Sequence, residues 1–461
     1  MRIPLGACLA VWLVGCAHSA GKTAEPATQD RHAQQLRSQA EKSYDALNFP
    51  ACASQYRQAA EASMDADSRS GSFYSAARCA ALANDAAQSI ELLKLAIQSG
   101  YYDADTLRYD MELASLHSAA SWQEVVASAQ ANLAKAPHPP LPVGVLSGLD
   151  VYGSRRADAE GVRKLLGFEL GKPLVHSKVI FRQKEEALRK QYNLAFAHLS
   201  YIYFFASEEA GNAYLTVDLV DAEDSQRLRF LPEPSGHPED PEGLVAQWME
   251  YDAKAIQLIQ KGMMDMEKGS VCRVPHCAFG FGHPDLAGYE PVFLGKVPKA
   301  QGALVKVLRE ETAPEKRAAA AKLLAYTSTL EQAAERLVPF IRDPAGDVRN
   351  SVLRVLTANQ EAADHPLVEV ATVVDALSLP ETTDRNKALY LLTMLLPDLK
   401  PEELKAQQPA LIRQIGAQLV ALSAMQQPIN REPAIEVLKL LSGESYETSE
   451  QWKAWLARQP T

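Results

Sequence analysis

Residues 337–350 read LVPFIRDPAGDVRN, and this stretch sets the pattern for the C-terminal part of the chain. An apolar run ends at Asp343 and Pro344, and after a small turn the next segment opens with Asp347 and Arg349. Proline after an apolar segment marks a helix end, and an acidic residue in a first turn marks a helix start. The stretch therefore predicts two helices joined by a tight turn.

The same arrangement recurs along residues 299–461. An arginine stands near the start of the second helix of each predicted pair, and these arginines lie 32, 36 and 46 residues apart: Arg317, Arg349, Arg385 and Arg431. The spacing predicts a short, irregular array whose pairs stack on their neighbours and form an elongated surface rather than a closed pocket. Trp452 and Trp455 are expected to cap its open end. The predicted helices span residues 301–308, 314–326, 330–341, 347–357, 366–377, 384–396, 409–424 and 432–441.

These residues resemble the HEAT repeat, a two-helix unit. In that family an aspartate and an arginine form a ladder between neighbouring repeats. The resemblance implies that Asp343, Asp347 and Arg349 are structural ladder residues, and they are the interaction candidates of this region. Asp384 and Arg385 match the pattern loosely.

Residues 32–136 also follow a helical pattern, with small residues where neighbouring helices approach closely. Ala59 and Ala96 occupy corresponding positions 37 residues apart, and Asp65–Asp67 is expected to form a polar turn. The pattern resembles the tetratricopeptide repeat, with Trp122 in a closing helix, and implies about two to three repeats with a small concave peptide groove. The predicted helices cover residues 34–47, 51–62, 73–83 and 86–98.

Residues 143–224 alternate between strand and helix signals. The expected order is a strand, two helices and two strands, which predicts a three-stranded sheet with two helices on one face. These elements cover residues 143–152, 158–166, 178–192, 196–205 and 213–220.

Four segments of this region resemble the polypeptide-transport-associated (POTRA) domain: LDVYG (149–153), VRKLLG (162–167), LGKPL (170–174) and YLTVDLV (214–220). In that family an exposed sheet edge engages clients or neighbours, as an unpaired strand can pair with a strand of another chain. Two interpretations are open. The edge recruits a partner, or the domain is a structural module whose edge is covered by its own loops.

The chain begins MRIPLGACLAVWLVGC, a positive residue and an apolar run followed by small residues and Cys16. The run is too short to cross about 30 Å of hydrocarbon as a helix, and this layout is typical of a removed export signal. Its end resembles the lipobox of bacterial lipoproteins, which implies removal of residues 1–15, acylation of Cys16 and, because Ala17 follows, outer-membrane sorting. The alternative is an ordinary export signal with a coincidental cysteine. Residues 16–31 are predicted to be an unstructured tether.

Export to an oxidising compartment would favour disulfide bonds between the cysteines. The chain has six, and loss of Cys8 with the signal and acylation of Cys16 leave four. An even number of cysteines in an exported protein is expected to pair. Cys52 and Cys79 lie on adjacent helices of neighbouring pairs, which suits a disulfide. The alternative is two small buried hydrophobic side chains.

Cys272 and Cys277 lie between the central domain and the C-terminal helices. Three interpretations are open: a local disulfide, a zinc site completed by His276 and His283, and neither. The spacing matches no zinc finger and an oxidising compartment favours pairing, so we expect a disulfide and no metal. The adjacent GFG at 280–282 lacks the third glycine and the flanking strand and helix of a dinucleotide site.

Motifs for catalysis are missing from the sequence. It contains no G-x-S-x-G and no H-E-x-x-H, and GKT at 21–23 lacks the strand and the correctly spaced glycine of a phosphate loop. We therefore expect no catalytic residues, no cofactor and no small-molecule substrate. The net charge of −10 is diffuse and forms no basic stripe, which argues against a nucleic-acid partner.

Together these patterns predict a mainly α protein with a small central α+β domain. The expected function is a non-enzymatic scaffold or protein-interaction module, lipid-anchored in the outer membrane, with unidentified protein partners in envelope or outer-membrane assembly. The alternative is an enzyme or ligand-binding protein with a site between the central domain and the Cys272–Pro284 loop. The predicted parts are a signal peptide (1–15), a tether (16–31), tetratricopeptide-like helices (32–136), a proline-rich linker (137–142), a POTRA-like domain (143–224), a connector (225–298) and HEAT-like helices (299–461).

Overall fold

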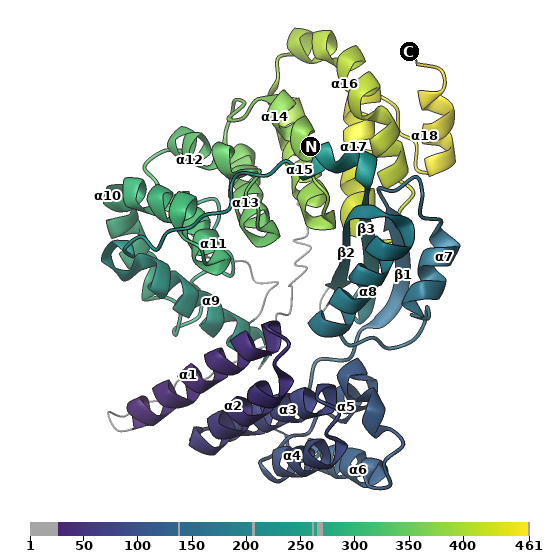
Figure 1. The fold of residues 1–461 in the computed structure, drawn as a ribbon. Helices are drawn as coiled ribbons and strands as arrows, with labels where there is room; N and C mark the ends of the chain where they lie inside the picture. The colour runs from purple at the N-terminus through teal and green to yellow at the C-terminus, as the bar shows by residue number, and fades with distance from the viewer. Residues whose placement is uncertain (1–25, 137–138, 205–207, 261, 265–270, 460–461) are drawn as a thin grey trace.

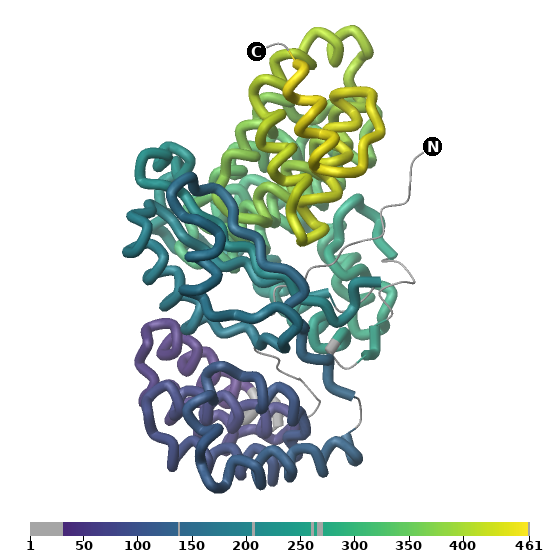
Figure 2. Tube along the Cα trace, turned by 90° about the vertical axis from the view of Figure 1, so that its right-hand side faces the viewer, coloured from purple at the N-terminus to yellow at the C-terminus, as the bar shows by residue number. Residues whose placement is uncertain are grey.

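The computed structural model describes residues 26–459 except 137–138, 205–207, 261 and 265–270. Within this range the chain is mainly helical with a small three-stranded sheet, which confirms the predicted fold class. Figure 1 shows the N-terminal helices at one end, the C-terminal helices at the other and the sheet between them, and Figure 2 shows the same order from the side. The predicted lipid-attachment residue Cys16 lies outside the described residues.

In the N-terminal array α1 to α4 pack each on the next in chain order, and α6 packs against α4 and α5. Ala59, Ala77 and Ala96 are fully buried where neighbouring helices approach, because only small side chains fit between closely packed backbones. Its elements are α1 (Pro26–Asp45), α2 (Phe49–Ala62), α3 (Ala66–Leu82), α4 (Ala86–Gln98), α5 (Ala104–Tyr109), η1 (Met111–Leu116) and α6 (Trp122–Leu133).

Two helix starts in this array differ from the expected positions. α1 begins at Pro26, inside the predicted tether, and proline is favourable in a first helical turn. α3 begins at Ala66, where a polar turn was expected. The reason is a helix cap, because the Asp65 carboxylate accepts the backbone N–H of Ser68 at 2.7 Å.

The central sheet has the strand order β1-β3-β2, with β3 parallel to β1 and antiparallel to β2. Leu215 in β3 pairs with Leu149 in β1, and the next core position, Val217, pairs with Leu199 in β2. These alternate residues share one hydrophobic core with the two helices that cover this face, as the sequence predicted. The elements are β1 (Val145–Tyr152), α7 (Ala159–Leu166), α8 (Lys178–Tyr192), β2 (Leu194–Tyr203) and β3 (Asn212–Asp221).

The C-terminal array has two layers (Figure 1). Helices α9, α11, α13, α15 and α17 form a continuous row, and α10, α12, α14 and α16 each pack against the row helix that follows them. α9 belongs to the same core as the row, although its sequence lies in the predicted connector. The helices are α9 (Leu244–Gln260), α10 (Tyr289–Glu310), α11 (Pro314–Leu323), α12 (Leu330–Leu337), α13 (Gly346–Ala362), α14 (Val370–Ala376), α15 (Thr382–Leu395), α16 (Pro401–Leu422), α17 (Pro428–Ser442) and α18 (Ser449–Leu456).

Two helices of the outer layer are longer than expected because each continues through a proline. α10 contains Pro298 and α16 contains Pro409, and proline is usually excluded from a helix interior. The Gln301 side-chain amide donates to the carbonyl of Pro298 at 2.9 Å. Trp452 and Trp455 are buried near the end of the array, which agrees with a capping role.

The second face of the sheet is covered by the C-terminal array. Ala213 to Asp221 of β3 are all buried, so both faces of this central strand are shielded from water. Ile202 and Tyr214 form a small hydrophobic cluster with Ile429 of α17. The sequence predicted helices on one face only, because alternation within a strand does not identify what covers the other face.

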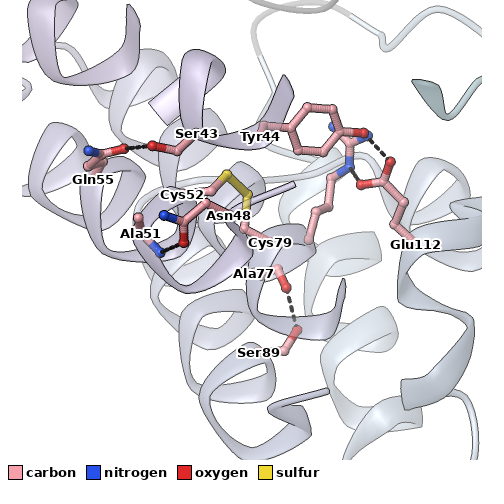
Figure 3. Close-up of a disulfide and its surroundings, with 11 residues drawn as sticks. Ser43, Tyr44, Asn48, Ala51, Cys52, Gln55, Ala77, Cys79, Ser89 and Glu112 are labelled. Carbon is pink, nitrogen blue, oxygen red and sulfur yellow. Dashed lines mark hydrogen bonds and ion pairs between the residues drawn. A yellow bond between two sulfur atoms is a disulfide. The ribbon is translucent and has the colours of Figure 1, made fainter. Parts of the chain in front are cut away.

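Both expected cysteine pairs lie at disulfide distance. The Cα atoms of Cys52 on α2 and Cys79 on α3 are 5.9 Å apart, and Figure 3 shows the bond between these helices. The Cα atoms of Cys272 and Cys277 are 6.1 Å apart. The first pair therefore joins two helices of the N-terminal array, and the second closes a short loop before α10.

Candidate functional site

The starts of the row helices form a repeated arginine site. Arg317 at the start of α11 donates through Nη1 to the carbonyl of Glu311 at 2.8 Å, six residues before it. Arg349 in α13 makes the equivalent bond to the carbonyl of Asp343 at 2.9 Å. Arg431 in α17 donates to the carbonyl of Gln426 at 2.7 Å. Each arginine thus ties a helix start to the loop that precedes it.

The arginines also pair with carboxylates of the next repeat. Arg317 contacts Asp343 through Nε at 3.1 Å and Nη2 at 2.8 Å. Arg349 contacts both oxygens of Asp384 at 2.9 Å. Asp343 and Arg349 therefore lie in a ladder of the kind that the HEAT resemblance implies. Asp347 lies exposed on the first turn of α13, and Asp384 occupies the pairing position instead.

The third ladder arginine, Arg385 in α15, finds its carboxylate in the sheet. Its Nη2 pairs with Asp218 of β3, and both side chains are fully buried. Asp218 also accepts the backbone N–H of Thr382 at 2.7 Å and the hydroxyl of Ser200 at 3.1 Å. The next repeat offers no carboxylate, because residues 425–431 read MQQPINR. The sheet supplies the missing acid of the ladder.

A second strand carboxylate, Asp150 of β1, caps the start of α17. It accepts the backbone N–H of Gln426 at 2.9 Å and that of Gln427 at 3.0 Å. Burial raises the pKa of Asp150, and these two N–H groups oppose the rise. Tyr152 at the end of β1 places its ring 4.2 Å from the guanidinium carbon of Arg385. The sheet thus contacts two consecutive helix starts of the row.

The segment that leaves β3 runs along the ladder (Figure 1). After η2 (Ala222–Leu228), the Phe230 ring lies 4.7 Å from the guanidinium carbon of Arg349. The Leu231 N–H donates to the carbonyl of Arg342 at 2.8 Å, and Gly236 exchanges backbone bonds with the loop before α11. The face of the row helices that carries Arg317 and Arg349, here called the ladder face, is therefore covered by the protein's own chain rather than open to a partner.

The outer edge of β1 is also occupied. Leu146 donates its N–H to the carbonyl of Lys172 at 2.9 Å and accepts the N–H of Gly171 at 2.8 Å. The Leu174 N–H donates to the carbonyl of Gly144 at 2.9 Å. Of the two interpretations of the sheet edges, coverage by the domain's own loop holds for this end of β1.

An ion pair lies on the outer edge of β2. The Glu185 carboxylate of α8 accepts the Leu199 N–H at 2.8 Å and lies 3.0 Å from Nδ1 of His198. Burial lowers the pKa of His198, but Glu185 and the charges of Glu381 and Asp218 outweigh it and raise the pKa to about 9. Burial raises the pKa of Glu185, and its bonds to His198 and Leu199 outweigh this and lower it. The pair is therefore charged at neutral pH.

The N-terminal array is joined to the central domain by another buried cluster. Nε of Arg78 in α3 lies 3.0 Å from both Asp110 and Glu112. Glu112 accepts the hydroxyl of Ser177, which caps α8, at 2.6 Å, and it also accepts the hydroxyl of Tyr44 (Figure 3). Burial raises the pKa of Asp110, and the charge of Arg78 opposes the rise. These contacts fix α8 against the N-terminal helices.

The disulfide loop packs against α9. The Tyr251 hydroxyl donates to the carbonyl of Cys277 at 2.6 Å, and the Nδ1 atom of His283 accepts the N–H of Asp285 at 3.2 Å. In the described part of the chain, no group of three or more His, Cys, Asp or Glu side chains is arranged to hold a metal ion. Nor does any described helix have the length and apolar character needed to cross a membrane.

The sequence reasoning missed the residues at both junctions. Asp218 lies in the apolar run YLTVDLV, on the face opposite Leu215 and Val217, and the available signal was that Tyr214 and Val220 make this second face apolar as well. Arg78, Asp110 and Glu112 carried no comparable signal, because charged residues are common on helices and their turns.

Replacing Asp218 with asparagine is expected to lower the free energy of unfolding by about 3–5 kcal/mol, because the buried charge of Arg385 would lose its partner. The exposed Asp347→Asn variant is the matched control and should change stability by no more than about 0.5 kcal/mol. Urea unfolding followed by circular dichroism measures both. Equal stability of the two variants would contradict the assigned role of Asp218.

The His198–Glu185 pair predicts a specific pH dependence. Because the folded pKa of His198 is raised, its contribution is complete below the ordinary pKa of about 6.5 and is lost as pH rises through about 9. The melting-temperature difference between wild type and His198→Gln should therefore be larger at pH 6 than at pH 10. His32→Gln, at an exposed position of α1, is the control and should show no such change. A difference for His198→Gln that is independent of pH would refute the assignment.

Comparison with known proteins finds no relative: no family model matches the chain, and neither a curated protein nor a solved structure matches it. The tetratricopeptide, POTRA and HEAT resemblances therefore stay predictions from the residues that carry them. The structure itself establishes a mostly helical chain with a small three-stranded sheet.

Proposed function

We propose that this chain is a non-enzymatic scaffold of the bacterial cell envelope. In this proposal Cys16 is acylated, the lipid holds the chain at the outer membrane, and the helical arrays recruit protein partners during envelope or outer-membrane assembly. The observation that carries the proposal is the combination of the lipobox-like start with two helical arrays fixed to one small sheet.

Fixed geometry between the parts supports a scaffold. The Ser177–Glu112 bond links the central domain to the N-terminal array, and the Asp218–Arg385 pair links it to the C-terminal array. A scaffold acts by holding its binding surfaces at set distances, and buried ion pairs with one good geometry favour this. The partly buried Arg78 and the buried Arg349 and Arg385 fasten one element to another, a use that favours a scaffold over an enzyme.

The N-terminal array is the surface that we propose for a protein partner. It lies at one end of the molecule in both views, away from the ladder face that the chain covers itself (Figures 1 and 2). Two large apolar side chains at its turns, Leu47 and Met64, are 55% and 56% exposed. They lie at opposite ends of α2 and mark two separate exposed apolar positions, each of which the double variant below changes.

Lipid attachment is tested by metabolic labelling with an alkyne fatty acid in the native host. Wild type and Cys8→Ser should incorporate the label, because residue 8 is removed with the signal. Cys16→Ser should incorporate none. Equal label in wild type and Cys16→Ser would refute acylation at this position.

Partner recruitment is tested by crosslinking intact envelopes and capturing the full chain. The same envelope proteins should be recovered with wild type and Cys8→Ser, and a charged double variant, Leu47→Glu with Met64→Glu, should lose those that bind the N-terminal array. Recovery of no envelope protein would contradict the scaffold. Unchanged recovery with the double variant would move the partner surface away from this array.

A further inference from the structure

The two helices that cover the sheet carry an excess of positive charge. Residues 155–190, which contain α7 and α8, have ten lysines and arginines and five aspartates and glutamates. This segment is therefore positive by five charges in a chain whose net charge is −10. Figure 1 shows α7 on the outer side of the central domain, away from α9 to α13. The charge of this layer is thus opposite in sign to that of the molecule as a whole.

Carboxylates balance six of the ten cations. The ion pairs are Arg155 with Asp224, Arg156 with Glu223, Lys178 and Arg182 with Asp45, and Arg189 and Lys190 with Glu186. Among the described residues, the other four are in no ion pair: Arg163, Lys164, Lys172 and Lys184. Glu160 and Glu169 are exposed acids of the same segment, and neither pairs with these four cations.

Two of the unpaired cations meet at the C-terminal end of α7. The Lys184 amine of α8 donates to the carbonyl of Leu165 at 3.2 Å, and Leu165 follows Lys164 in the chain. Lys164 is exposed in the last turn of α7. Cations are favourable at this end of a helix, because the last carbonyl groups give it a partial negative charge.

The other two cations border the outer edge of β1. Arg163 donates through Nη2 to the carbonyl of Leu149 at 3.2 Å. The carbonyl of Lys172 accepts the N–H of Leu146 at 2.9 Å, three residues earlier in the same strand. At about 3.3 Å per residue, these two contacts lie about 10 Å apart along one strand edge. The four cations therefore occupy one side of the domain.

Exposed apolar side chains lie in the same place. Leu170 is 55% exposed, two residues before Lys172. Its loop is held in position, because Gly171 donates its N–H to the carbonyl of Leu146 at 2.8 Å. Val145, which is 37% exposed, pairs with Pro173 of this loop. Apolar side chains beside lysines and arginines are typical of a surface that lies at a membrane interface.

We propose that Arg163, Lys164, Lys172, Lys184 and Leu170 form a face, here called the α7 face, that docks on an anionic lipid bilayer. The cations contact the headgroups, and Leu170 enters the boundary between headgroups and acyl chains. A bilayer suits charges that are spread over two helices and a loop, because a fluid surface requires no fixed spacing of its partners. The inference rests on the proposed location at a membrane, but it does not depend on acylation.

The test uses the intact chain reconstituted with vesicles of phosphatidylcholine, or of an equal mixture of phosphatidylcholine and phosphatidylglycerol. Hydrogen exchange measured by mass spectrometry follows the amides of residues 163–174. These amides should exchange several-fold more slowly with the mixed vesicles than with the neutral ones, because docking shields them from water. Flotation with the neutral vesicles reports the lipid anchor alone, so failure of the anchor and failure of the α7 face are separate results.

A double variant, Lys164→Gln with Lys172→Gln, removes two exposed cations of the face. Each cation near an anionic surface strengthens binding by about fivefold, so the docking constant should fall about 25-fold and the slow exchange should be lost. Leu170→Ser should weaken docking several-fold without a change in charge. The matched control is Lys400→Gln with Lys405→Gln, which removes two exposed cations at the start of α16 and should behave as wild type.

Slow exchange that requires phosphatidylglycerol, and that the α7-face variants lose while the control keeps it, supports the proposal. Equal exchange with both kinds of vesicle would overturn it. Equal loss in the double variant and its control would also overturn it, because the effect would then be one of net charge. Slow exchange in isolated envelopes but not with the mixed vesicles would assign the face to an acidic protein instead of a lipid surface.

Discussion

The buried pair of Asp218 and Arg385 joins the sheet to the C-terminal helices. Two ions removed from water are unfavourable unless each is paired and its remaining positions are hydrogen-bonded. Asp218 meets this condition with Thr382 and Ser200, and Arg385 also donates to the carbonyl of Pro380. Such a pair adds little net stability, but it selects one docking geometry, because any shift would leave a charge unpaired. The position of the sheet on the array follows from this constraint.

This docking reduces the surface of the C-terminal array that is accessible to another molecule. In an open array the ladder side would be a free surface, but here β3 supplies one acid and the following segment covers the arginines before it. The central domain acts as the end of the ladder rather than as a separate unit.

The local structure was largely predictable, whereas the junctions were not. Apolar spacing and turn residues predicted the helices and the strand-helix-helix-strand-strand order, and adjacent helices predicted the approach of Cys52 to Cys79. The predicted helix starts differ from those in the structure where a cap such as Asp65 sets the first residue, or where the helix continues through an internal proline. Asp218 and Arg385 are 167 residues apart, and periodicity shows which face of an element is apolar, not which element covers it. The candidate sites lie where such distant elements meet.

The bond between Cys52 and Cys79 alters how the molecule would respond to mechanical load. A chain pulled from its N-terminus transmits tension through α1 into α2, and a stack of short helices would unravel one helix at a time. At Cys52 the covalent path passes directly to Cys79, 27 residues further along the chain. The residues between Cys52 and Cys79 carry no tension, so the enclosed parts of α2 and α3 cannot be drawn out, and the load passes from Cys79 into the end of α3 and on to α4. The segment from Cys52 to Cys79 therefore keeps its length under load, whereas the helices outside it rely on packing alone.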